Sequence, residues 1–159
     1  MAGLEPVPIE NILDGDELKT DIRQLNTKIE ELGPDNIVCV LSTTSCFAPR
    51  GVDDLPAISQ ICRQTNLPHI VNNAYGLQSR ICCDRIERSF TSRPKISHSE
   101  LNSEDAEHGI DFIVQSCDKN FLVPVGGAII ASYSKQKLEA AKKMYSGELN
   151  LGFLMSQEP

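Results

Sequence analysis

Short apolar runs alternate with helix-forming segments along most of this chain, and this alternation restricts the fold more than any other feature. Four apolar runs are bounded by polar residues: NIVCVL (36–41), LPHIVNNA (67–74), IDFIVQS (110–116) and GGAIIASYS (126–134). Continuous apolar runs of this length are typical of strands that are buried on both faces, and intervening helices connect such strands in parallel. We therefore expect a layered α/β fold built on a largely parallel sheet.

Helical periodicity appears in three segments. The first runs through 17–33, where apolar residues recur every three or four positions, Asp14 or Asp16 can cap the start and Gly33 ends the helix. The second covers 53–66, with Asp53 near its cap, and the third covers 135–145. Ahead of them, EPVPIENI (5–12) is predicted to be a short strand at a sheet edge, because its two prolines cannot donate hydrogen bonds to a ladder.

Charge and composition exclude several classes of protein. The formal net charge is −7 with a pI near 4.9, whereas proteins that bind nucleic acid over their whole surface are basic. Binding of nucleic acid would therefore need a local basic patch, and residues 80–95 are the candidate. A solvated loop is the favoured interpretation of these residues. No run approaches the roughly 18 apolar residues of a membrane helix, and the first residues do not resemble a signal peptide. We expect a cytoplasmic protein with no membrane partner.

The cysteine pattern favours free thiols over disulfides or zinc. Three of the six cysteines (Cys39, Cys62 and Cys117) lie in apolar runs, where cysteine behaves as a small hydrophobic residue, and no C-x-x-C pair occurs. We therefore expect reduced cysteines and no metal site. The cysteines are Cys39, Cys46, Cys62, Cys82, Cys83 and Cys117.

Polar residues with chemical potential follow two of the predicted strands. Lys119 comes directly after IDFIVQS, and desolvation at such a position lowers a lysine pKa and makes its amine a nucleophile for carbonyls. This is what a Schiff base to pyridoxal phosphate requires. In the turn NNAYG (72–76), Asn72 has the position from which pyridoxal enzymes address the pyridine nitrogen, and Tyr75 could lie near the ring. A solvated lysine and a simple Asn/Gly turn are the alternatives.

Other candidates are weaker. Gly126-Gly127 lacks the G-x-x-x-x-G-K pattern of a phosphate loop. His69 lies within a strand-like run and is expected to be a core histidine with satisfied hydrogen bonds. A Cys–His hydrolase stays open as an alternative, although no cysteine stands out as its nucleophile.

Three segments carry a resemblance to a known family: LSTTSCFAPR (41–50), PHIVNNAYG (68–76) and VQSCDKNFLVPVGGAIIA (114–131). They closely resemble the O-phosphoseryl-tRNA(Sec) selenium transferases. The resemblance implies a three-layer α/β large domain of fold-type I pyridoxal phosphate transferases, a homotetramer, and the conversion of O-phosphoseryl-tRNA(Sec) to selenocysteinyl-tRNA(Sec) with selenophosphate. It also implies that Lys119 holds pyridoxal 5'-phosphate and that Asn72 faces the pyridine nitrogen.

The same resemblance assigns only part of a family domain to this chain. We expect residues 1–147 to form a partial large domain, with an irregular insertion at 83–109, and residues 148–159 to be an unmatched tail. At Glu148 the family has an arginine that holds the substrate phosphate, and a carboxylate there would repel it. Weak or absent activity of the chain alone is therefore expected. The alternative is a non-catalytic module that associates with full-length subunits.

Overall fold

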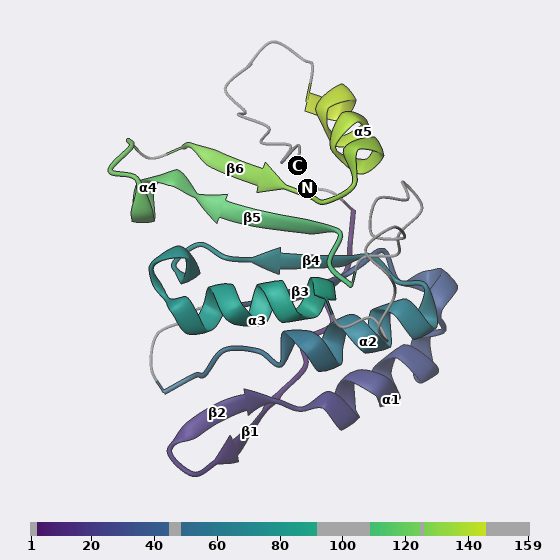
Figure 1. The fold of residues 1–159 in the computed structure, drawn as a ribbon. Coiled ribbons are helices and arrows are strands. Elements are labelled where there is room, and N and C mark those ends of the chain that lie inside the picture. The colour runs from purple at the N-terminus through teal and green to yellow at the C-terminus, as the bar shows by residue number, and fades with distance from the viewer. Residues whose placement is uncertain (1–2, 45–48, 92–108, 125, 146–159) are drawn as a thin grey trace.

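The structure is a computed structural model of the 159-residue chain, and it describes residues 3–44, 49–91, 109–124 and 126–145. Within these ranges a four-stranded sheet organises the fold (Figure 1). Its strands, in spatial order, are β3 (Val40–Thr43), β4 (His69–Asn72), β5 (Phe112–Ser116) and β6 (Ala128–Ala131). The β3–β4 and β4–β5 pairs are parallel, and β6 is antiparallel to β5. The predicted α/β class with a largely parallel sheet is confirmed.

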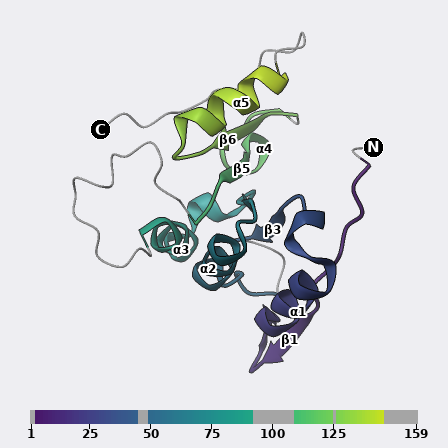
Figure 2. The same ribbon diagram turned by 90° about the vertical axis from the view of Figure 1, so that its right-hand side faces the viewer.

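Two helices form a layer against one face of this sheet. The helices α2 (Leu55–Thr65) and α3 (Arg80–Thr91) lie side by side there (Figure 2). Side chains from both helices pack with strand residues into one apolar cluster, in which Leu55 and Val71 are fully buried. Of the three layers that the family resemblance implies, the described residues supply the sheet and this helical layer. Leu41, on β3, is 68% exposed.

A second apolar cluster joins α1 (Ile22–Leu32) to α2. Leu25 and Ile29 of α1 pack against Ile58 and Ile61 of α2, with Val40 of β3 alongside. Gly33 ends α1 as predicted, and its N–H donates to the Ile29 carbonyl. The short 3-10 helix η1 (Pro34–Asn36) then leads into β3.

The N-terminal predictions were wrong in detail. The first strand is not 5–12 but β1 (Asn11–Asp14), which pairs with β2 (Glu17–Thr20) in an antiparallel hairpin. Gly15 turns the chain between them at a positive φ of 62°, which glycine adopts without steric cost. Residues 17–20 therefore extend instead of opening the helix, and α1 begins after Asp21, whose carboxylate accepts from two backbone N–H groups.

The start of α2 also differs from the prediction. The helix begins at Leu55, two residues later than predicted, and Asp54, next to Asp53, caps it by accepting from the Ala57 N–H at 3.2 Å. Asp53 is instead buried, where its carboxylate pairs with the Arg50 guanidinium at 2.7 Å and accepts from the Thr43 N–H at 2.7 Å. A charge in this position has a structural role, because it ties the end of β3 to the start of α2.

The C-terminal half follows the predicted order. The last helix, α5 (Lys135–Tyr145), has the predicted bounds and lies at the β6 end of the sheet (Figures 1 and 2). The helix α3 takes up the beginning of the expected insertion at 83–109, and the part at 92–108 lies outside the described residues, as does the tail at 148–159. No helix in the described ranges is long and apolar enough to cross a membrane.

Candidate active site

The carboxyl ends of three parallel strands meet at one edge of the sheet. Thr44 follows β3, the turn 72–76 follows β4, and the single-turn helix α4 (Cys117–Asn120) follows β5 (Figure 1). Ligands of parallel α/β sheets bind at this edge. The two segments singled out in the sequence therefore lie on neighbouring strands, since Asn72 pairs in register with Val114 of β5.

Lys119 projects its amine from α4 toward a carboxylate and an aromatic ring. Its Nζ atom lies 2.5 Å from Oδ2 of Asp118 and 5.9 Å from the centroid of the Tyr75 ring. The carboxylate of Asp118, more than the ring, raises the pKa of the Lys119 amine. The expectation of a lowered pKa was wrong in its net direction: partial burial does lower the pKa of the amine, but the hydrogen bond to the Asp118 carboxylate raises it by more.

Asn72 begins a tight turn at the end of β4. Its Oδ1 atom accepts from the Ala74 N–H at 3.0 Å, which is an Asx turn. This bond identifies the oxygen of the amide and leaves the NH2 group as the end that can meet a ligand. Asn72 is exposed, whereas its neighbour Asn73 is buried.

The Asn73 side chain links the turn to the neighbouring strands through hydrogen bonds. The sequence analysis gave Asn73 no role. Its Oδ1 atom accepts from the Thr44 hydroxyl at 2.5 Å, and its Nδ2 atom donates to Oε1 of Gln115 at 3.1 Å. All three side chains are buried, so these bonds cross from β3 through β4 to β5 within the fold. The one available signal was Gln115, a polar residue inside an otherwise apolar run, because a buried amide needs partners.

Gly76 closes the turn in a space that admits no side chain. A Cβ atom at this position would lie 2.1 Å from Oδ1 of Asn73 and 2.4 Å from Oγ1 of Thr44. Both distances are far below van der Waals contact. The glycine of NNAYG is therefore required by the close approach of these buried polar groups.

Amide hydrogen bonds join the Tyr75 turn to the Lys119 segment. The carbonyl oxygen of Ala74 accepts from Nδ2 of Asn120 at 2.7 Å and from Nε2 of Gln115 at 3.0 Å. On the other side of α4, the Cys117 N–H donates to the Gly127 carbonyl at 3.0 Å. The lysine and the tyrosine are thus carried by two loops that are tied to each other and to β6.

His69 is a core histidine, as expected. It is fully buried, its Nδ1–H donates to the Gly109 carbonyl at 2.9 Å, and its Nε2 accepts from the Ser42 hydroxyl at 2.7 Å. Burial lowers the pKa of its imidazole, so the ring is neutral at pH 7. His98, His108 and Cys46 lie outside the described residues, and Cys39, Cys62, Cys82, Cys83 and Cys117 are free thiols.

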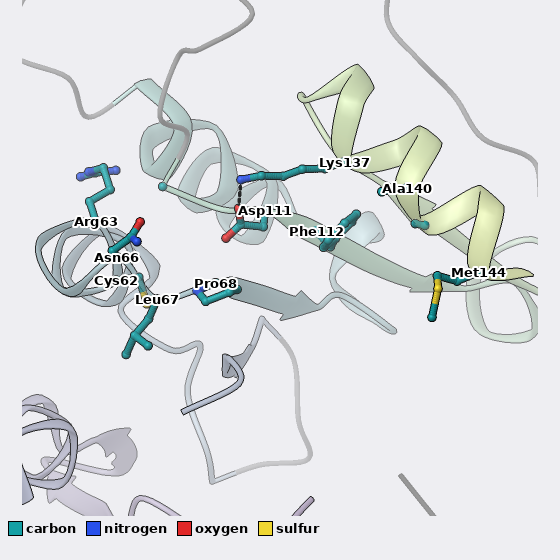
Figure 3. Close-up of a pocket in the computed structure, with 12 residues that line it drawn as sticks. Cys62, Arg63, Asn66, Leu67, Pro68, Asp111, Phe112, Lys137, Ala140 and Met144 are labelled. Atoms are coloured by element: carbon teal, nitrogen blue, oxygen red, sulfur yellow. Dashed lines mark hydrogen bonds and ion pairs between the residues drawn. The ribbon is translucent and has the colours of Figure 1, made fainter. Parts of the chain in front are cut away.

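A hollow of about 520 Å³ lies at the opposite end of the sheet. It opens between α2 and α5 at the amino ends of β4 and β5, where Lys137 pairs with Asp111 (Figure 3). Pro68 and Phe112 line it. Its walls contain neither of the predicted loops, and its position at the amino ends of the strands is not where α/β sheets hold their ligands. We therefore place the candidate active site at Lys119.

The side chains at Lys119 fit pyridoxal phosphate by their chemistry. A primary amine can bond to the cofactor aldehyde, an aromatic side chain lies beside it, and an amide NH2 stands at the end of the adjacent strand. Within the described residues, no group of three or more His, Cys, Asp or Glu side chains could hold a metal ion.

The sheet, its helical layer and the lysine turn (Cys117–Asn120) define a layered α/β protein whose candidate site lies at the carboxyl edge of a largely parallel sheet. Residues 1–151 match the family model of O-phosphoseryl-tRNA(Sec) selenium transferase, SepSecS. The chain therefore belongs to this family.

Individual relatives agree with the family match. The O-phosphoseryl-tRNA(Sec) selenium transferases of Dictyostelium discoideum and Caenorhabditis elegans are 45% and 44% identical to this chain, over 94% and 92% of it. A crystal structure of an archaeal O-phosphoseryl-tRNA(Sec) selenium transferase superposes on 76% of the chain with a TM-score of 0.60 and 30% identity. The chain spans 28% and 27% of the length of the two relatives and 24% of the crystallised chain.

Proposed function

We propose that this chain carries the cofactor-holding lysine of a pyridoxal phosphate-dependent selenium transferase that converts O-phosphoseryl-tRNA(Sec) to selenocysteinyl-tRNA(Sec) with selenophosphate. The observation that carries the proposal is Lys119, placed at the carboxyl edge of the sheet beside the Tyr75 ring in a chain of this family. The cytoplasm, where tRNA is used, is the proposed location.

Three residues would hold the cofactor. Lys119 would bond covalently to its aldehyde through Nζ. Tyr75 would lie against the ring, and the Asn72 NH2 would donate to a ring nitrogen that carries no proton, since its own oxygen is already engaged by the Ala74 N–H. These roles rest on the resemblance together with the side-chain placement.

When bound, pyridoxal phosphate supplies an electron sink that acidifies the α-carbon of the seryl group and lets the β-phosphate leave. The chain contributes proton handling at that carbon. Lys119, whose amine lies at this edge of the sheet, would be the base that carries the α-proton. The tied loops at Ala74 keep Tyr75 and Lys119 in one relative position during this exchange.

Cofactor binding tests the proposal. The purified chain is titrated with pyridoxal phosphate and followed by visible absorption, with Lys119→Ala as the test variant. Lys142→Ala is the matched control, because Lys142 is an exposed lysine of α5, far along the chain from the lysine turn. Saturable binding that Lys119→Ala abolishes and Lys142→Ala preserves is the expected result. Equal binding by all three proteins would contradict the proposal.

A second candidate function is association with longer subunits of the same family without catalysis. Exposed apolar side chains favour it: Leu41 of β3 is 68% exposed and Leu122, next to the lysine turn, is 97% exposed. The family resemblance also implies a homotetramer. Native mass spectrometry of the chain, alone and mixed with a full-length family member, tests this; mixed oligomers support it and separate species contradict it.

A further inference from the structure

The carboxylate beside Lys119 is held in place from two sides. Oδ2 of Asp118 lies 2.5 Å from the lysine Nζ, while the Ser116 hydroxyl donates to Oδ1. The Asp118 side chain is only 15% exposed. Ser116 is the last residue of β5, so the hydroxyl that orients the carboxylate is itself fixed by the sheet.

This ion pair is shorter and less exposed than the Arg80–Asp84 pair on α3. Asp84 and Arg80 on α3 approach only to 4.0 Å, with side chains that are 47% and 93% exposed. Exposed pairs of that kind contribute little energy and do not fix a side chain. Asp118, in contrast, has both carboxylate oxygens in hydrogen bonds. It directly precedes Lys119 in α4, and the two side chains contact each other.

The other group that faces the lysine is Tyr75. Its ring centroid lies 5.9 Å from Nζ, within the range of a cation–π contact. A carboxylate and an aromatic face both favour the ammonium form over the neutral amine. The pKa of Lys119 is raised accordingly, with the Asp118 carboxylate as the first cause.

We propose that Asp118 is a positioning residue that holds the Lys119 amine protonated and in place at the strand end until an aldehyde competes for the same nitrogen. The inference rests on the proposed function, because the competing aldehyde is that of the cofactor. When the amine reacts, the ammonium gives one proton to the carboxylate, nitrogen bonds to the aldehyde carbon, and the aldehyde oxygen leaves as water with the two remaining amine hydrogens. Atoms and charge balance without a further reactant.

The test measures the titration of Lys119 in the chain without any cofactor. Lysines are reductively methylated with ¹³C-formaldehyde, and the methyl signal of Lys119, assigned by its loss in Lys119→Arg, is followed by NMR from about pH 8 to about pH 11, around the ordinary lysine pKa. In the native chain its midpoint should lie above that of Lys142 in the same spectra. Asp118→Asn should move the midpoint to lower pH, and Asp118→Glu should restore part of the shift. Asp84→Asn, the matched control, should leave it unchanged.

Two outcomes would overturn the inference: a Lys119 midpoint equal to that of Lys142 in the native chain, or a midpoint that Asp118→Asn does not move. The first comparison does not use Asp118→Asn, so it decides even if that variant fails to fold. The cofactor titration separates this inference from the proposed function. A shifted midpoint with no binding at Lys119 contradicts the function, whereas binding with an unshifted midpoint contradicts the role of Asp118.

Discussion

Gly76→Ala is the substitution whose effect follows most directly from the geometry of the site. The new methyl carbon would lie 2.1 Å from Oδ1 of Asn73 and 2.4 Å from Oγ1 of Thr44, and both atoms are buried. To make room, the turn must move and break the Asn73–Thr44 hydrogen bond. Overpacking costs about 1–3 kcal/mol, and a buried polar group left without its partner costs about 1–3 kcal/mol more. We expect a loss of roughly 2–6 kcal/mol in the free energy of unfolding.

Urea unfolding followed by circular dichroism measures this loss. Gly15→Ala is the control, because Gly15 has a positive φ of 62° but no atom within 4 Å of an added Cβ. It should lose only about 1 kcal/mol, through backbone strain without a clash. If Gly76→Ala is as stable as the native chain to within about 0.5 kcal/mol, the packing at the NNAYG turn described above is wrong.

Three further predictions concern the core, pH and activity. Leu55→Ala should cost about 2–5 kcal/mol of unfolding free energy, because Leu55 is fully buried in the sheet–helix cluster, whereas Leu41→Ala, at a 68% exposed position, should cost about 0.5 kcal/mol or less. Burial lowers the pKa of His69 in the folded chain, so the unfolded chain binds more protons than the folded chain as the pH falls below about 6.5. The free energy of unfolding should therefore decline below about pH 6.5, and His69→Gln should flatten this part of its pH dependence. The chain alone should convert O-phosphoseryl-tRNA(Sec) weakly or not at all, since it spans about a quarter of its relatives (28% of the D. discoideum protein); robust conversion in a tRNA assay would contradict this.

Local rules predicted the fold well where one rule dominated. The bounds of α5 follow from a run of strong helix formers, and β4 and β5 lie inside the predicted apolar runs. At the N-terminus two rules competed. Leu18 fits the helical period of α1, yet Gly15 turns the chain and pairs residues 17–20 with β1, so tertiary context decided against the periodicity.

Sequence patterns singled out Lys119 and Tyr75, but they did not indicate the roles of Asn73 and Asp118. Lys119 and Tyr75 could be singled out because they follow apolar runs, and the structure brings them together. The roles of Asn73 and Asp118 depend on partners that are distant in the chain or on a side-chain direction, such as the bond from Asn73 to Gln115. No spacing rule carries that information. The direction of the Lys119 pKa was wrong for the same reason, because it depends on the carboxylate next to the amine.

Covalent trapping of the cofactor tests the central claim most directly. The chain is incubated with pyridoxal phosphate, reduced with borohydride, digested and mapped by mass spectrometry, with Lys119→Ala treated in parallel. The account predicts one dominant pyridoxyl adduct, confined to the peptide that contains Lys119 and absent from the variant. Adducts spread over the exposed lysines of α5, and unchanged in Lys119→Ala, would show that the lysine turn is not the cofactor site.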